Sequence, residues 1–164
     1  MSAKRKAGLA AALITGMLAA CSDPAGPPAG YTGPDEVGRV VMSFGVDPLR
    51  FRRDAWALDS ARIDGDTLRL RVTHGGGCAR HGYALIAWNG WLESNPVQVG
   101  LLLAHDARGD ACRALLSPEL RFDLEPLRAA WLADYHGEHG TLVLRFSDPV
   151  NPAGPPLGTL TWSF

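Results

Sequence analysis

Two histidines and two aspartates are the side chains whose types and spacing could do chemistry in this sequence. The set is His81, His105, Asp106 and Asp110. His81 lies three residues after Cys78, and Asp110 lies two residues before Cys112. A bond between the two cysteines would bring these segments to one end of the fold. We therefore expect the four polar side chains to lie near one another.

Three kinds of site fit this set of side chains. Histidine nitrogens and carboxylate oxygens are zinc ligands, and an aspartate can also orient a histidine for proton transfer. The third interpretation is a hydrogen-bonded staple between loops. Alternation along a strand places His81 on the face opposite Cys78, so His81 and Asp110 can meet only through a bulge or a turn, which Gly109 allows. His74 lies seven residues before His81, which is not a recognised ligand spacing.

A staple tolerates looser geometry than a metal, whose ligands converge within about 2.0–2.2 Å of one point. The sequence therefore favours the staple and predicts neither a cofactor nor a catalytic residue. Metal binding and proton transfer remain the alternatives.

The N-terminus predicts export and a lipid anchor. Three cations at residues 4–6 precede an apolar run at residues 7–20, which is too short for a transmembrane helix and typical of a secretory signal. The run ends in Leu18-Ala19-Ala20-Cys21, which resembles the lipobox of bacterial lipoproteins. This resemblance implies cleavage before Cys21 and lipid on its sulfur, whereas the alternative is an ordinary signal peptide. The residue after the Cys is Ser22. In the lipoprotein family an Asp at this position implies retention at the inner membrane, so Ser22 implies the outer membrane, with the domain facing the periplasm.

Cys78 and Cys112 remain once Cys21 is assigned to lipid. Outside the cytoplasm, an even pair is typical of a disulfide. The chain-entropy model gives an upper figure of about 3.8 kcal/mol for closing a loop of about 35 residues. A pair of reactive thiols is an alternative, and a zinc site is another, although no second Cys-x-x-Cys completes it.

Composition divides the rest of the chain into two parts. Residues 21–38 are rich in Pro and Gly and predict a tether, and residues 39–164 are long enough for one domain with its own core. The whole chain has a net charge of −1, and loss of the three cations of residues 1–20 makes the mature chain −4. No basic surface for nucleic acid is expected.

The pattern after residue 39 predicts a mainly β fold. Short segments with alternating or continuous apolar residues predict strands at 39–44, 56–63, 67–73, 81–88, 97–104, 111–116, 120–124, 141–147 and 158–164. Pro126 and helical spacing of apolar residues predict one short helix at 125–133. Many short strands favour a β-sandwich, Ig-like or related. Trp88 and Trp91 flank Asn89-Gly90, a turn signal, and either pack in the core or form an aromatic binding surface at a hairpin tip.

Residues 74–127 resemble a group of bacterial secreted proteins and lipoproteins. The shared elements are Gly76-Gly77-Cys78-Ala79-Arg80-His81, Glu93-Ser94-Asn95-Pro96, the segment from His105 to Cys112, and Phe122-Asp123-Leu124-Glu125-Pro126-Leu127. A weaker resemblance extends to the C-terminal β-sandwich of NigD-like lipoproteins. The resemblance implies a fold and a cellular location, and it implies no activity.

Three functions follow as hypotheses. The first is a lipid-anchored envelope module that binds an envelope protein, a glycan or a small ligand. The second is a metal-binding protein or metal-dependent enzyme built on His81, His105, Asp106 and Asp110. The third is a structural part of an envelope complex. The sequence favours the first.

Overall fold

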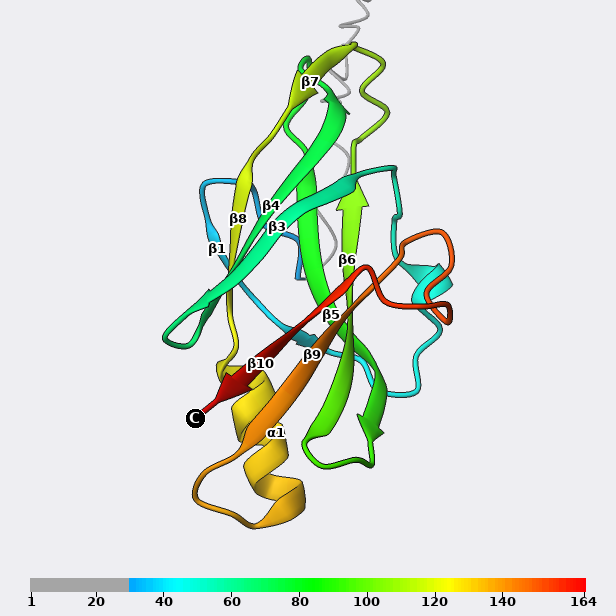
Figure 1. The fold of residues 1–164 in the computed structure, drawn as a ribbon. Coiled ribbons are helices and arrows are strands. Elements are labelled where there is room, and N and C mark those ends of the chain that lie inside the picture. The colour runs from blue at the N-terminus through cyan, green and yellow to red at the C-terminus, as the bar shows by residue number, and fades with distance from the viewer. Residues whose placement is uncertain (1–29) are drawn as a thin grey trace, which may run out of the picture.

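The computed structural model describes residues 30–164. The expected signal peptide, Cys21 and the first part of the expected tether lie outside these residues. The described chain forms two sheets packed face to face, with one helix at one end of the molecule (Figure 1). The mainly β sandwich with one short helix and one disulfide, expected from the sequence, is confirmed.

Both sheets are mixed. The first has the order β1 (Val37–Arg39), β8 (Glu119–Asp123), β4 (Thr67–Gly76) and β3 (Ala57–Asp64), and β7 (Ala114–Leu116) pairs with the far part of β4. The second has the order β10 (Gly158–Ser163), β9 (Thr141–Ser147), β6 (Val97–Asp106), β5 (Gly82–Leu92) and β2 (Val41–Met42). The pairs β1–β8, β2–β5 and β6–β9 are parallel, and the others are antiparallel.

Strand β4 shows why the core stops where it does. Leu68, Leu70 and Val72 are at most 1% exposed, and the arginines between them face outward, as the alternation predicted. His74 is the next residue on the inward face and is 4% exposed. The apolar core therefore passes into a polar cluster along a single strand.

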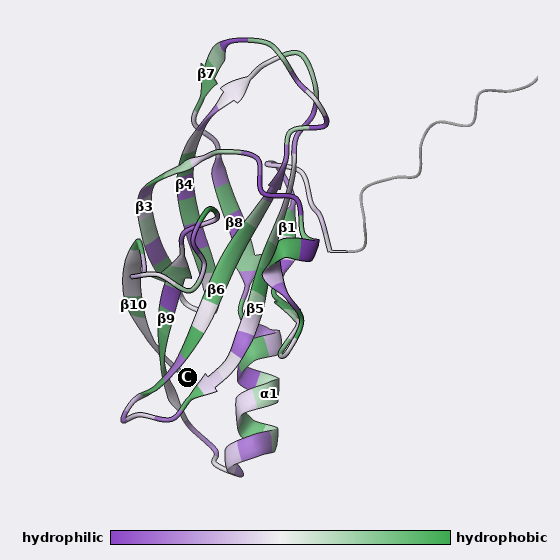
Figure 2. Ribbon diagram, turned by 90° about the vertical axis from the view of Figure 1, so that its right-hand side faces the viewer, coloured by the Kyte–Doolittle hydropathy of each residue, from purple (hydrophilic) through white to green (hydrophobic). Residues whose placement is uncertain are grey.

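The first part of β5, residues 82–87, is buried on both faces, which explains its continuous apolar sequence (Figure 2). One face joins the core between the sheets. Ala84 and Ile86 on the other face pack with Tyr31, and Val41 and Phe51 lie against them. Tyr31, which falls in the expected tether, therefore packs against the sandwich, where its aromatic ring covers the outer face of β5.

The Asn89-Gly90 signal does not mark a hairpin tip. It lies inside β5, where the register with β6 shifts between Ala87 and Trp91, and Asn89 Oδ1 accepts a hydrogen bond from the backbone N–H of Gly100 at 2.7 Å. Gly90 has φ +69°, which allows this bulge. The indole of Trp88 donates to Ser147 and that of Trp91 donates to Asp134, so both indoles are bonded within the fold and no exposed aromatic tip forms.

The helix α1 (Glu125–Tyr135) covers one end of the sandwich, and the predicted helix at 125–133 is confirmed. Pro126 stands in its first turn, Leu127 is fully buried, and His136 ends the helix in the left-handed conformation. A single-turn helix, η1 (Pro48–Arg50), lies in the connection from β2 to β3. Within residues 30–164, no helix is long and apolar enough to cross a bilayer.

Candidate metal centre

Three histidines come together in the fold. They come from parts of β4, β6 and the segment before β5 that lie at the end of the molecule opposite α1 (Figure 1). His74 belongs to β4 of the first sheet, His81 immediately precedes β5, and His105 lies near the end of β6. They are 4%, 4% and 1% exposed. One ring nitrogen of each lies within 4.8 Å of one from each of the others. Histidine is fully buried less often than the apolar residues, so three buried imidazoles at this spacing are unusual.

The position of His105 is fixed by backbone contacts on both sides. It pairs with Tyr83 across the antiparallel ladder, so the two side chains share the inward face and their rings stack at a centroid distance of 5.1 Å. On the other side, its N–H donates to the carbonyl of Arg52, and its carbonyl accepts from the N–H of Asp54. The ring therefore stands on a rigid part of the sheet.

Each histidine has one outer ring nitrogen that contacts an acceptor. Nδ1 of His74 lies 2.9 Å from the carbonyl of Gly75, and Nδ1 of His105 lies 3.2 Å from the carbonyl of Asp54. Nε2 of His81 lies 3.2 Å from Oδ2 of Asp110. A carbonyl and an ionised carboxylate only accept hydrogen bonds, so each outer nitrogen carries the proton and donates.

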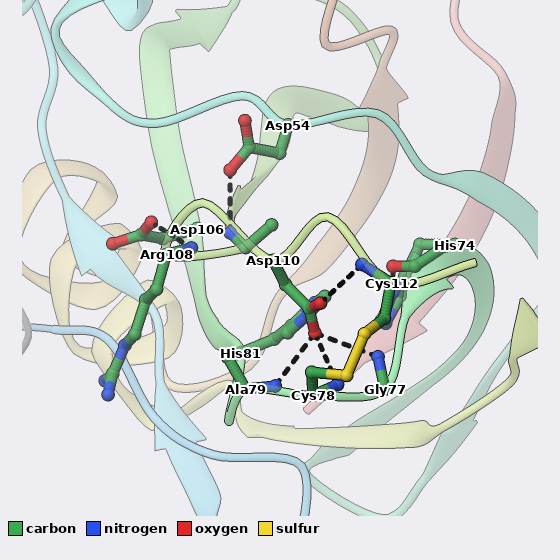
Figure 3. Close-up of polar contacts among 12 residues, drawn as sticks. Asp54, His74, Gly77, Cys78, Ala79, His81, Asp106, Arg108, Asp110 and Cys112 are labelled. Atoms are coloured by element: carbon green, nitrogen blue, oxygen red, sulfur yellow. Dashed lines mark hydrogen bonds and ion pairs between the residues drawn. A yellow bond between two sulfur atoms is a disulfide. The ribbon is translucent and has the colours of Figure 1, made fainter. Parts of the chain in front are cut away.

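Asp110 is held by the backbone around it (Figure 3). Its Oδ2 accepts from the N–H groups of Gly77, Cys78 and Ala79 at 2.8–2.9 Å, and its Oδ1 accepts from that of Cys112. These hydrogen bonds, first that of Cys112, hold the pKa of Asp110 far below its ordinary range, so the carboxylate stays ionised. Its side chain is fully buried.

The expected disulfide between Cys78 and Cys112 is present, with their Cα atoms 5.9 Å apart. It joins the two backbone segments that bind Asp110. The turn expected at Gly109 is also present, with φ +73°. Gly76, at φ +143°, passes so close to the cluster that a Cβ there would lie 2.6 Å from the ring of His81. Disulfide, turn and glycine together seat Asp110 against His81.

The inner nitrogens carry lone pairs when the three histidines are neutral. These are Nε2 of His74, Nδ1 of His81 and Nε2 of His105. Nε2 of His74 accepts from the hydroxyl of Tyr83 at 2.6 Å. Nδ1 of His81 and Nε2 of His105 face each other at 2.8 Å, and two lone pairs at this distance repel. This contact is favourable only with a cation between the two nitrogens, either a proton or a metal ion.

Burial shifts the pKa values of His105 and Tyr83. It is the main cause that lowers the pKa of His105 to about 4, and the positive charge of a protonated His74 lowers it further. Burial also raises the pKa of Tyr83 to about 12, so the phenol keeps its proton and can donate. His105 is therefore neutral at physiological pH, which is the form that binds metals.

The structure brings together three of the four residues singled out in the sequence. His81, His105 and Asp110 are in contact, whereas Asp106 lies outside the cluster, and its Oδ1 accepts from the N–H of Arg108 in the following turn (Figure 3). Consecutive strand residues point to opposite faces, so Asp106 does not share the inward face of His105. Asp106 instead caps a backbone amide in the turn, as the staple interpretation expected.

His74 is the ligand candidate that the sequence-based set missed. The signal was present, because His74 continues the inward series of Leu68, Leu70 and Val72 along β4. Its seven-residue separation from His81 hid the relation, since His74 lies on β4 of the first sheet and His81 immediately precedes β5 of the second, and no local spacing rule applies to them.

A cavity of about 400 Å³ reaches the cluster from outside. It is lined by His74, His81 and Tyr83, with Arg80 and the segment Leu116–Pro118 among its other walls. Arg80 at the cavity is paired with Glu36 at 2.7 Å. Two of the three imidazoles are therefore accessible to a small molecule without opening the core.

The fold is similar to that of a NigD-like immunity protein from Bacteroides caccae. The TM-score is 0.50 at 16% sequence identity, and the match covers 78% of this chain and 63% of that protein, so the chain spans less than two thirds of it. The expected likeness to NigD-like proteins is thereby confirmed for the fold.

Two further solved structures match with lower TM-scores. A toxin-related protein from Parabacteroides distasonis matches at 0.41 with 17% identity, over 77% of this chain and 60% of that one. A protein of unknown function from Bacteroides vulgatus matches at 0.44 with 11% identity, over 77% and 55%. No family model matches the sequence, and no curated protein matches it.

Proposed function

We propose that this protein binds a transition metal ion, with Zn²⁺ as the first candidate, through His74, His81 and His105. The observation that carries the proposal is the proximity and the tautomer of the three rings. Each outer nitrogen donates to a carbonyl or a carboxylate, which leaves the other nitrogen of each ring as an acceptor, and one ring nitrogen of each histidine lies within 4.8 Å of one from each of the others. Metal-binding histidines have this arrangement, because the outer hydrogen bond fixes the tautomer and the ring orientation.

The shortest nitrogen–nitrogen distance in the cluster is near that of a zinc site. Four-coordinate zinc takes histidine nitrogens at about 2.0–2.1 Å, which places neighbouring nitrogens about 3.3–3.4 Å apart. The inner nitrogens of His81 and His105 lie 2.8 Å apart, so a widening of about half an ångström admits the ion. Imidazole ligands suit Zn²⁺, Cu²⁺, Ni²⁺ and Fe²⁺, so zinc is tested beside copper.

A staple does not require this arrangement. A loop staple would be complete with Asp110 on the backbone amides and the disulfide beside it. Such a staple does not require three buried histidines whose ring nitrogens lie within 4.8 Å of one another. A proton on Nδ1 of His81, shared with His105, would satisfy that one contact, whereas a metal ion would also join His74 to the other two histidines.

The metal-binding domain would act at the cell envelope. The lipobox-like segment supports cleavage before Cys21 and a membrane anchor through lipid, with the domain at the outer membrane facing the periplasm. The disulfide fits an oxidising compartment. Binding of an envelope protein or a glycan stays a prediction.

Metal analysis of the untagged protein tests the proposal. The mature chain with Cys21→Ser, exported behind an ordinary cleavable signal peptide so that it stays in solution, is dialysed against metal-free buffer, and binding of titrated zinc and copper is measured by native mass spectrometry and calorimetry. We expect one ion per chain. If the dissociation constants of both zinc and copper are weaker than micromolar, the proposal is overturned.

Three variants remove the inner nitrogens and keep the outer donors. His74→Asn and His105→Asn retain a nitrogen near the Nδ1 position, and His81→Gln retains one near the Nε2 position. Each should fold and lose metal affinity by at least a hundredfold. His139→Ala, an exposed histidine at the other end of the molecule, is the matched control and should bind like wild type. Equal binding in all four variants would place the metal elsewhere.

A further inference from the structure

We infer that the metal has an open fourth coordination position, reached through the cavity, that takes a small anion with Tyr83 as its hydrogen-bond donor. This inference rests on the proposed metal site. Three protein nitrogens leave one position of a tetrahedral ion without a protein ligand, which is the arrangement of zinc sites that exchange a bound molecule. The cavity of about 400 Å³ ends at two of the three rings, so that position has a route to solvent.

Tyr83 provides the first argument. Tyr83 is 2% exposed, and its hydroxyl lies 2.6 Å from Nε2 of His74, which is the nitrogen that would bind the metal. A metal ion on this nitrogen takes the lone pair that the hydroxyl uses. The buried O–H then lacks an acceptor, and a buried unpaired donor is unfavourable by the full desolvation of the group. An oxygen or nitrogen atom of a metal-bound anion restores the acceptor at the same place.

Charge provides the second argument. Three neutral imidazoles leave the double positive charge of the ion uncompensated among its direct ligands. Asp110 contacts the outer nitrogen of His81 and faces away from the ion. No carboxylate of the described residues lines the cavity, and the one charged residue on its wall is the cation Arg80. A buried charge is stable only when it is paired, so the vacant position favours an anion over a neutral ligand.

The stacking of Tyr83 on His105 fixes the position of this donor. The two rings are parallel to within 4°, and the backbone of Tyr83 pairs with Thr32 on its other side. The hydroxyl therefore cannot move far when the metal binds. A donor held in advance at the open position selects ligands with an acceptor atom next to the metal, such as hydroxide, azide, thiocyanate or a carboxylate.

Cobalt substitution tests the inference with azide as the probe. Four-coordinate Co²⁺ absorbs strongly in the visible range, and its bands move when a ligand exchanges. We expect the spectrum of the cobalt-loaded protein to shift saturably with azide, and formamide, a neutral molecule of similar size, to leave it unchanged. Tyr83→Phe should bind one Co²⁺ per chain and should weaken azide binding by about tenfold.

Tyr31→Phe is the matched control, because it removes the hydroxyl of another buried tyrosine on the outer face of β5. It should bind azide like wild type. A spectrum that ignores azide at full cobalt occupancy would overturn the open position while the metal site stands. A spectrum changed by Tyr83→Phe without azide would show Tyr83 to be a ligand and would also overturn it. If no cobalt binds, the proposed function itself fails.

Discussion

The two ends of this sandwich are closed by clusters of rings, but the chemistry of the clusters differs. At the α1 end, Trp131 and Tyr135 of the helix stack on each other, Trp131 meets Phe164 edge-on, and Phe164 contacts Trp162. At the opposite end, Tyr83 and the histidines His74, His81 and His105 occupy the equivalent gap between the sheets. The first cluster is apolar and the second is polar, although both fill the mouth of one core.

Their hydrogen bonding shows what the difference means. Among the described residues, the indole N–H groups of Trp131 and Trp162 are buried without a partner, so the aromatic end is stabilised by apolar contact and tolerates unpaired donors. At the histidine end, every outer nitrogen has an acceptor, and Asp110 binds four backbone amides. Apolar rings suffice to close this fold, so the ordered polar groups at the other end need a further explanation, for which we proposed the metal ion.

Truncation at the aromatic end is expected to have the largest effect on stability and none on metal binding. Trp162 is 3% exposed and packs in the main core, so Trp162→Ala should lower the free energy of unfolding by about 3–5 kcal/mol. Zinc affinity of the folded variant should equal that of wild type. Urea denaturation and calorimetry at low temperature measure both quantities, and a parallel loss of affinity would contradict the separation of the two ends.

Loss of the disulfide should affect stability and metal binding together. Cys78→Ser with Cys112→Ser should lower the free energy of unfolding by about 2–4 kcal/mol, because the unfolded chain gains freedom. The same change releases the backbone that positions Asp110, so zinc affinity should also fall, by about tenfold. Unchanged zinc affinity in the folded double variant would separate the disulfide from the site.

Asp110→Asn should act on metal binding more than on the fold. The amide can accept from some of the backbone N–H groups, but it has no charge to support His81. Loss of such a partner lowers metal affinity by about 10–100-fold. Competition with a chromophoric chelator measures the change. If Asp110→Asn binds zinc as tightly as wild type, His81 does not need this partner and the proposed orientation of its ring is wrong.

The sequence predicted the fold well because the signals were local. Alternation in Leu68–Val72 and the turn residues after Ile63 gave the hairpin, and Pro126 gave the helix. The cysteine count gave the disulfide. Asn89-Gly90 misled because the same dipeptide that favours a hairpin turn also favours a bulge, and only pairing with β6 decides between them.

Only part of the site was predicted, because its residues come from both sheets. The link between Cys78 and Cys112 brought His81 and Asp110 together, as expected. His74 was missed because its partners face it across the interior, and the contact between sheets depends on packing that no spacing rule describes. Alternation alone would have added His74 and removed Asp106, since it applies to β4 and β6 alike.

Asp106→Ala therefore gives the smallest effect and completes the comparison with Asp110. The two carboxylates stand four residues apart, and each accepts a backbone N–H two residues further along the chain, Arg108 for Asp106 and Cys112 for Asp110. Only Asp110 also contacts a histidine. Asp106→Ala should lower the free energy of unfolding by about 0.5–1.5 kcal/mol through loss of its turn, with zinc affinity unchanged within twofold. A hundredfold loss of affinity in Asp106→Ala would mean that this carboxylate reaches the metal, and the three-histidine centre would have to be redrawn with an acidic ligand.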